Sequence, residues 1–282
     1  MFVKIFRSYN NSWGSQYTQA MAKKRIAVIS PIVDGVQQVE LPSWDKFFPY
    51  VNTTLHNPHD YIFRGQRRSS WKLETSLDRA LKVLKQPVNT ARHLEQFRLS
   101  TRGRRGVSPQ LLDEEGWWAL GQQFGLSTPL LDWTESPFVA LYFCFIERNK
   151  TETGKRAVFA LSRPLMQSKS ASISQKHLQS PARPDVLNII TPESDENTRL
   201  VNQRGLFTRS TTGVDIEKWV KRHFSGNTRK RVLVKIVIPE KRGDRLEALR
   251  MLNRMNINHL SLFPDVGGSA EYCNMRLTVT GY

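Results

Sequence analysis

Two short blocks of the sequence place polar side chains at the ends of apolar runs, where the fold alone does not need them. In the first block, Arg64 ends the run Tyr61–Phe63 and is followed by Gly65 and Gln66. A planar guanidinium group can bind two phosphate oxygens at once, and glycine lets a ligand approach the backbone. The block therefore indicates a phosphate site, and the alternative for Arg64 is an ion pair at a strand end.

The second block is Thr128–Thr134, in which Asp132 and Thr134 lie on either side of Trp133, directly after two leucines. A carboxylate and a hydroxyl group at this position could bind a polar ligand. The alternatives for Asp132 are a helix N-cap and a salt bridge.

Both blocks resemble motifs of the FRG domain family, which is named for its Phe-Arg-Gly triplet. Further segments resemble other motifs of the family and occur in the family's order over roughly residues 40–275. Two positions depart from the usual pattern: Gln123 stands where the family usually has histidine, and Pro129 stands where it usually has arginine. Gln123 can form hydrogen bonds but cannot titrate near neutral pH. The similar segments are Ser43–Phe48, Trp71–Leu77, Trp118–Phe143, Asn202–Thr208 with the preceding Arg199, and Leu262–Gly268.

The FRG family is in turn similar in layout to ADP-ribosyltransferases, whose split sheet binds NAD in a cleft. The resemblance implies an α+β fold with an ADP-ribosyltransferase-like split β-sheet and an additional helical N-terminal half. It also implies catalytic roles for Arg64 and for a late acidic residue, with Asp265 and Glu271 ranked equally and Asp132 behind them. The reaction passes through a ribose cation, which a carboxylate stabilises. The residues expected to bind NAD are Arg64, Gly65, Gln66, Thr128, Asp132, Trp133, Thr134, Gln203 and Phe207.

The formal charge of the 282-residue chain is +17, which favours a polyanionic partner. We therefore expect a nucleic-acid acceptor, RNA first, contacted by Arg102, Arg104 and Arg105. Some FRG-like proteins resemble RNA-modifying toxins of toxin–antitoxin or phage-defence systems, which implies an antitoxin partner and, as an option, a chaperone. The rival functions are a non-catalytic nucleic-acid-binding module, transfer of ADP-ribose to protein, and a nuclease.

The two cysteines, Cys144 and Cys273, favour a reducing compartment and hence the cytoplasm. The six histidines show no metal-ligand spacing, so we expect no metal site. No apolar run approaches the length needed to cross a bilayer, so we expect no membrane segment.

We expect residues 1–36 to be an N-terminal extension and residues 37–282 to form the domain. Helices dominate the predicted elements of the first half and strands those of the second, which favours an α+β domain over a doubly wound sheet. A polar stretch, residues 168–180, is predicted to be an exposed loop. The predicted strands are 61–64, 127–131, 157–161, 186–190 and 232–238. The predicted helices are 44–55, two within 76–104, one capped by Ser108 and ending at Phe124, one capped by Thr134 over 135–148, and 216–224 and 245–256.

Overall fold

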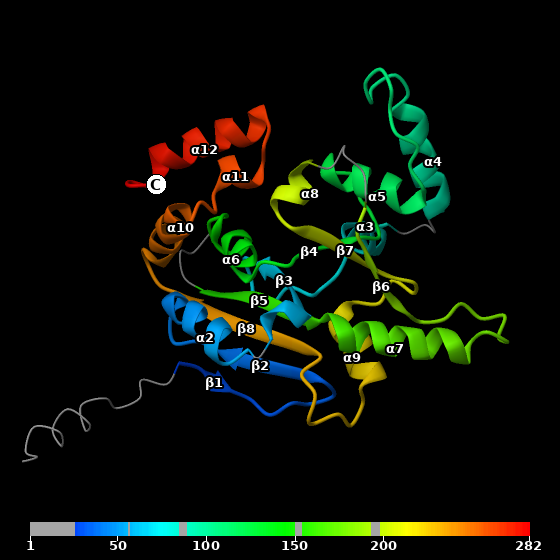
Figure 1. The fold of residues 1–282 in the computed structure, drawn as a ribbon, viewed down its shortest axis with the longest axis horizontal. Helices are drawn as coiled ribbons and strands as arrows, with labels where there is room; N and C mark the ends of the chain where they lie inside the picture. Colours follow the sequence, from blue (N-terminus) through cyan, green and yellow to red (C-terminus); the bar gives the residue numbers. More distant parts are fainter. Residues whose placement is uncertain (1–25, 56, 85–88, 150–153, 193–197) are drawn as a thin grey trace, which may run out of the picture.

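The computed structural model describes residues 26–55, 57–84, 89–149, 154–192 and 198–282, and the fold is α+β, as predicted. The described strands form one eight-stranded sheet with helices on both faces (Figure 1). The β2–β8 pair is parallel, and the other described pairs are antiparallel. In sheet order, the strands are β1 (Val28–Ile29), β2 (Val36–Glu40), β8 (Leu233–Glu240), β5 (Gly154–Ser162), β3 (Tyr61–Gln66), β4 (Leu131–Thr134), β7 (Gly205–Ser210) and β6 (Leu187–Ile190).

The central strands are buried on both faces because alternate residues of a strand point to opposite sides of the sheet. In β5, Val158 and Ala160 join one core cluster, while Phe159 and Leu161 join the other. The first cluster includes residues of α2 (Phe47–Thr53), α6 (Pro137–Phe145) and α10 (Asp244–Arg254). The second includes residues of α7 (Arg163–Lys176) and α9 (Ile216–His223).

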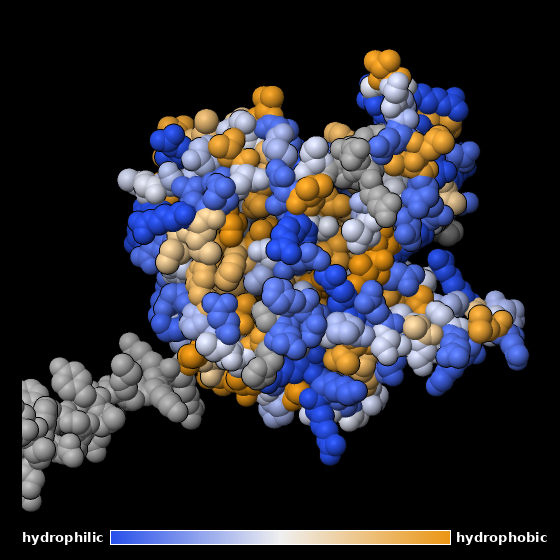
Figure 2. Space-filling model, viewed as in Figure 1, coloured by the Kyte–Doolittle hydropathy of each residue, from blue (hydrophilic) through white to orange (hydrophobic). Residues whose placement is uncertain are grey.

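A third, smaller core lies between β6–β7 and the helices α4 (Thr90–Ser100) and α5 (Glu114–Gln123). Leu94, Trp118 and Phe207 are among its buried members. The end of α4 and the loop that follows it extend away from the body of the protein (Figure 1), and we call residues 98–112 the arm. Hydrophobic atoms are visible at the outer end of the arm, beside hydrophilic ones (Figure 2).

The sheet opens between β3 and β4. These strands are joined by one register pair, Phe63 with Thr134. By contrast, β3 pairs with β5 along its whole length, and β4 pairs with β7 along its whole length. Beyond Phe63, Arg64 and Asp132 therefore lie on strands that separate, and the space between the strands is open to side chains and ligands.

Three predicted element boundaries are wrong in an informative way. The helix expected after Ser108 begins instead at Glu114, because Asp113 accepts a hydrogen bond from the amide of Gly116 at 2.7 Å and caps α5. The helix expected after Thr134 begins at Pro137 and is capped by Ser136.

The strand expected over residues 127–131 is instead Leu131–Thr134. Thr128 is outside it, and its amide donates to the hydroxyl of Ser76 at 3.0 Å. Most of the predicted loop 168–180 is helical and belongs to α7. Of its serines, Ser170 is buried, and its hydroxyl donates to the carbonyl of Leu187 on β6 at 2.8 Å.

The other predicted elements agree with the structure apart from small shifts in their ends. The expected helical N-terminal half is wrong, because β1, β2, β3 and β4 lie in the first half of the chain and α7, α9 and α10 lie in the second. Predicted strands 61–64, 157–161, 186–190 and 232–238 correspond to β3, β5, β6 and β8. No described helix is both long and apolar enough to cross a membrane. Residues 26–36 contribute β1 and the first residue of β2 to the sheet, and residues 1–25 lie outside the described part of the chain, so the expected domain boundary stays a prediction. The other helices are η1 (Trp44–Lys46), η2 (Pro58–Asp60), α3 (Ser76–Val83), α8 (Thr198–Asn202), α11 (His259–Leu262) and α12 (Val266–Thr278).

Candidate functional site

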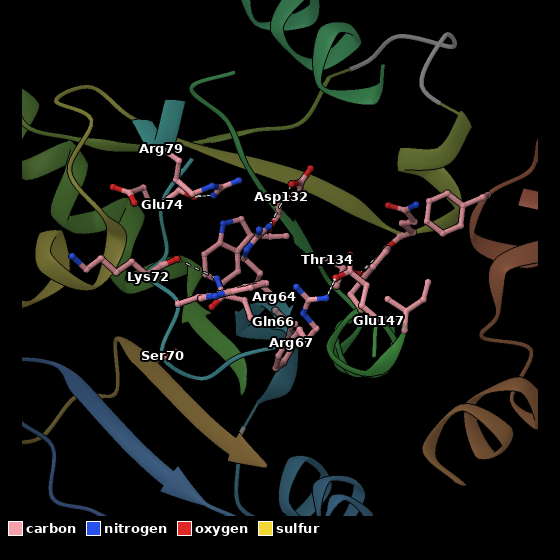
Figure 3. Close-up of a pocket in the computed structure, with 18 residues that line it drawn as sticks. Arg64, Gln66, Arg67, Ser70, Lys72, Glu74, Arg79, Asp132, Thr134 and Glu147 are labelled. Carbon is pink, nitrogen blue, oxygen red and sulfur yellow. Dashed lines mark hydrogen bonds and ion pairs between the residues drawn. The ribbon is translucent and has the colours of Figure 1, made fainter. Parts of the chain in front are cut away.

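A cavity of about 730 Å³ lies where β3 and β4 separate. The loop after β3 and the start of α3 supply Ser70, Lys72, Glu74 and Arg79 on one side, and Thr134 and Glu147 lie on the other (Figure 3). Its volume is in the usual range for a small-molecule site. Seven of the residues predicted to bind NAD line this cavity: Arg64, Gly65, Gln66, Asp132, Trp133, Thr134 and Gln203.

Arg64 lies in the middle of the cavity and points toward Asp132 (Figure 3). Its Nη1 donates to the backbone carbonyl of Asp132 at 2.7 Å and lies 3.4 Å from the Asp132 carboxylate. Burial lowers the pKa of the guanidinium group, and the Asp132 carboxylate partly opposes that shift. The Nε of Arg64 is buried without a hydrogen-bond partner among the described residues, while the side chain as a whole is 21% exposed.

Asp132 is held from the other side by Gln122 of α5. The amide nitrogen of Gln122 donates to the Asp132 carboxylate at 3.0 Å, while its amide oxygen accepts from the buried hydroxyl of Thr128. Thr128 therefore contributes by orienting Gln122 and does not line the cavity. The chain of bonds from Thr128 through Gln122 and Asp132 fixes the direction of the Arg64 side chain.

Gly65 lines the cavity, and a packing contact accounts for its lack of a side chain. A Cβ atom built on Gly65 would lie 1.9 Å from the carbonyl oxygen of Ala140 and 2.6 Å from the amide nitrogen of Cys144. Both atoms belong to the backbone of α6, which therefore packs directly on β3. Glycine is therefore needed at position 65 for contact with α6, and not only for the approach of a ligand as expected.

The two block residues next to Asp132 face different surroundings. Trp133 lines the cavity but is only 3% exposed, and its indole N–H donates to the hydroxyl of Thr208 at 2.9 Å. The hydroxyl of Thr134 donates to the backbone carbonyl of Gln203 at 2.7 Å. Gln203 in turn donates to the carbonyl of Leu262 at 3.1 Å, so these bonds join β4 to the C-terminal helices at the cavity wall.

The loop that follows β3 supplies further residues to the cavity. Arg67 forms an ion pair with Glu147 at 2.7 Å, and its guanidinium carbon lies 5.2 Å from the centre of the Trp71 ring. Gln66 donates to the carbonyl of Lys72 at 3.3 Å, which holds the loop against β3. The pair Arg67-Arg68, directly after the Phe-Arg-Gly-Gln block, was the sequence feature that could have revealed this group.

A buried ion pair between Arg156 and Glu240 holds the chain segment that carries Glu147 to the cavity. Arg156 and Glu240 are 2.6 Å apart, and their side chains are 0% and 3% exposed. Arg156 also donates to the backbone carbonyls of Cys144 and Glu147, the latter at 3.0 Å. The pair therefore fixes the C-terminal end of α6, where the Glu147 side chain reaches the cavity.

The two acids ranked first from the sequence are not among the residues that line the cavity. Asp265 caps α12, and its carboxylate pairs with Nε of Arg199 at 2.6 Å, an interaction that lowers the pKa of Asp265. Glu271 lies in the middle of α12 and is exposed. The carboxylates that do line the cavity are Glu74, Asp132 and Glu147.

The remaining predicted residues lie in the third core and in the arm. Phe207 is 5% exposed and packs in the third core. Arg102 and Arg104 are exposed, and Arg105 lies over the ring of Trp117 at 4.5 Å. The structure thus separates a basic arm from the cavity.

Among the described residues there is no group of three or more histidine, cysteine or acidic side chains that could hold a metal ion.

Comparisons with known proteins bear on the part of the chain that forms the cavity. The family model of the FRG domain matches residues 59–153, which include β3, the loop that follows it, β4 and α6. Curated proteins and solved structures give no match. The matched segment supplies Arg64, Asp132 and Glu147 to the cavity. Residues 59–153 of the chain are therefore similar to the FRG domain.

Proposed function

We propose that this protein is an ADP-ribosyltransferase that takes NAD as donor and modifies a nucleic acid, RNA first. The observation that carries the proposal is the cavity at the opening between β3 and β4, with Arg64 at its centre. The strands β3 and β4 are joined by a single register pair, and this supports the split-sheet cleft that the ADP-ribosyltransferase resemblance implies.

The residues of the cavity fit a dinucleotide. Four cationic side chains line it, and three buried polar atoms of its wall, Arg64 Nε, Gln66 Oε1 and Arg67 Nε, have no hydrogen-bond partner among the described residues. Buried polar atoms without partners are costly, and a polar ligand would remove that cost. Arg64 and Arg79 would hold the diphosphate, and the neighbouring rings of Phe143 and Phe263 would contact one of the two heterocycles.

We assign the stabilising carboxylate to Glu147. A negative charge near the ribose is needed because positive charge develops there when the nicotinamide bond breaks. Asp132 is engaged by Arg64 and Gln122, and Glu74 is paired with Lys82. Glu147 lines the cavity with its side chain 64% exposed and has Arg67 as its ion-pair partner. Displacement of Arg67 by an anionic ligand would leave the Glu147 carboxylate available.

The test is transfer of label from NAD that carries a labelled adenylate phosphate to separate pools of RNA, DNA and protein. We expect labelled RNA with the wild type. Arg64→Lys keeps the charge but loses the paired hydrogen bonds, so activity should fall by roughly tenfold or more. Glu147→Gln should abolish transfer with NAD binding nearly intact, because the charge acts mainly in the transition state.

Glu271→Gln is the matched control, since it removes the charge of an exposed carboxylate outside the cavity lining. If Glu147→Gln keeps full transferase activity and either Glu271→Gln or Asp265→Asn loses it, the stabilising carboxylate is one of the two acids predicted from the sequence. Label in the protein pool alone would replace the RNA acceptor by a protein acceptor.

A non-catalytic nucleic-acid-binding module is the second candidate, favoured by Gln123 at the family's histidine position and by the basic arm. Nicotinamide release separates the two functions, because only the enzyme consumes NAD. A toxin or phage-defence role, with an antitoxin partner, rests on the resemblance alone. Growth arrest on expression that Arg64→Lys relieves would support that role.

A further inference from the structure

The cavity mouth carries an exposed tryptophan among cationic side chains. Trp71 is 42% exposed and lines the cavity from the loop between β3 and α3. The guanidinium carbons of Arg67 and Arg68 lie 5.2 and 6.0 Å from the centre of its ring. Lys72, the next residue, is exposed and also lines the cavity. Among the described residues, the exposed large aromatic side chains are Trp71 and Phe124, and Trp71 is the one that lines the cavity.

The loop holds Trp71 in position before any ligand arrives. The amide of Ser69 donates to the carbonyl of Lys155 on β5 at 2.8 Å, and the amide of Trp71 donates to the carbonyl of Arg68 at 3.2 Å. The side-chain amide of Gln66 donates to the carbonyl of Lys72, the residue after Trp71, at 3.3 Å. Because the backbone of the loop is already held, less conformational entropy is lost when Trp71 binds a partner.

We propose that Trp71 is the stacking platform for an unpaired base of the acceptor strand, with Arg68 and Lys72 contacting its phosphates. This inference rests on the proposed function, because it names the position of the nucleic-acid acceptor at the same cavity. An aromatic face combined with cationic side chains is the arrangement that binds single-stranded nucleic acid without sequence preference. A base in a duplex is already stacked and paired, so this surface selects single strands.

The charges around Trp71 favour a nucleic acid over an acidic protein surface. Arg68 and Lys72 form no ion pair with any described residue, while Glu74, the acidic residue of the loop, is engaged by Lys82. The neighbouring Arg79 adds a further cation at the same rim. The surface thus offers positive charge beside a flat ring, and a base linked to a phosphate matches both.

The experiment measures binding of a fluorescent single-stranded RNA to the full chain without NAD, by anisotropy. The probes are the single strand, its duplex, and a strand of the same length with abasic sites in place of bases. Trp71→Ala should weaken binding of the single strand between roughly fivefold and a hundredfold, and Trp71→Phe should retain most of it because a ring remains. The duplex and the abasic strand should bind more weakly and respond little to Trp71→Ala.

Phe124→Ala is the matched control, since Phe124 is a 73% exposed ring outside the cavity lining, and it should leave RNA binding unchanged. Thermal unfolding of each variant verifies that the fold is intact. Equal binding of the single strand by wild type and Trp71→Ala would overturn the inference, as would equal affinity of the wild type for the abasic strand. Loss of binding only when the arm arginines are replaced would move the contact to the arm.

The outcome is independent of the proposed catalysis. Base-dependent binding through Trp71 in a protein that does not consume NAD would retain this inference and remove the transferase. NAD-dependent labelling of RNA that does not depend on Trp71 would do the reverse.

Discussion

Replacement of Glu240 should destabilise this protein far more than replacement of a similar residue at the surface. Glu240 and Arg156 form a buried ion pair on the adjacent strands β8 and β5, and their side chains are 3% and 0% exposed. In Glu240→Gln, the buried guanidinium of Arg156 loses its counter-charge. The carboxylate of Glu240 also accepts from the side-chain amide of Asn149, so one donor group of the new amide must face another donor.

The magnitude follows from what remains around Arg156. Two backbone carbonyls, those of Cys144 and Glu147, still accept from it, but neither carries a full charge. Removal of one partner of a buried pair costs about 3–5 kcal/mol of unfolding free energy. At about 2–4 °C per kcal/mol in proteins of moderately large size, the melting temperature should fall by about 6–20 °C.

The control is Glu40→Gln, which breaks the exposed pair between Glu40 and Lys155, the residue that precedes Arg156. That pair is 3.3 Å long and about half exposed on both sides, so its loss should cost at most about 1 kcal/mol. Urea unfolding at pH 7 and thermal unfolding would measure both variants. Hydrogen exchange should also show faster opening at the end of α6 in Glu240→Gln, because Arg156 fixes the carbonyl of Glu147 there.

The double variant Arg156→Met with Glu240→Leu distinguishes charge from packing. It leaves no buried charge, but the carbonyls of Cys144 and Glu147 lose their donor, which costs about 1–3 kcal/mol for each group. The double variant should therefore be less destabilised than the sum of the two single variants. Additive single effects, or a Glu240→Gln protein as stable as Glu40→Gln, would refute the argument.

Three further predictions concern packing, pH and the arm. Gly65→Ala should lower the unfolding free energy by about 1–3 kcal/mol or more, because the new Cβ would lie 1.9 Å from the Ala140 carbonyl of α6. Gly267→Ala is the control and should cost less, because the nearest atom to its Cβ is a side-chain oxygen at 3.1 Å. Urea unfolding measures both variants. Burial lowers the pKa of His259, so the unfolded chain binds a proton more readily, and unfolding free energy should fall as pH decreases below about 6.5. A urea series at pH 7.5 and 5.5 should show a smaller loss for His259→Phe than for the wild type, and equal losses would exclude His259 as the cause. If the arm binds phosphates, replacing three of its arginines with serine should make RNA affinity less dependent on salt. The slope of log affinity against log salt should decrease in magnitude by about 0.9 for each phosphate that is no longer neutralised. An unchanged slope would show that the arm is not part of the interface. The three are Arg102, Arg104 and Arg105.

Local sequence patterns predicted the strands β3, β5, β6 and β8, but not β2 or β7, and they misplaced β4. The apolar runs of β3, β5 and β8 are long and buried on both faces, so composition alone identified them. Resemblance to FRG motifs brought Arg64 and Asp132 together although they are 68 positions apart. What could not be predicted depends on tertiary contacts. Residues 168–180 are polar in sequence, and their helical packing becomes clear only from the hydrogen bond between Ser170 and Leu187. Asp132 was expected at the site from the sequence, but Glu74 and Glu147 were not, and Glu147 reaches the cavity because it follows α6, which packs on β3.

The Phe-Arg-Gly triplet has two physical roles, which fall on opposite faces of β3: packing against α6 and lining the cavity. Along β3, Phe63 and Gly65 point to the same side because side chains alternate on a strand. Phe63 is fully buried in the core that contains α6, and Gly65 admits the backbone of that helix. Arg64 points to the other side, into the opening beside Asp132. A change at Gly65 thus reports on the packing of α6, whereas Arg64→Lys reports on ligand binding. Loss of stability in the first variant and of NAD turnover in the second would show that one short motif both closes the core and forms the site.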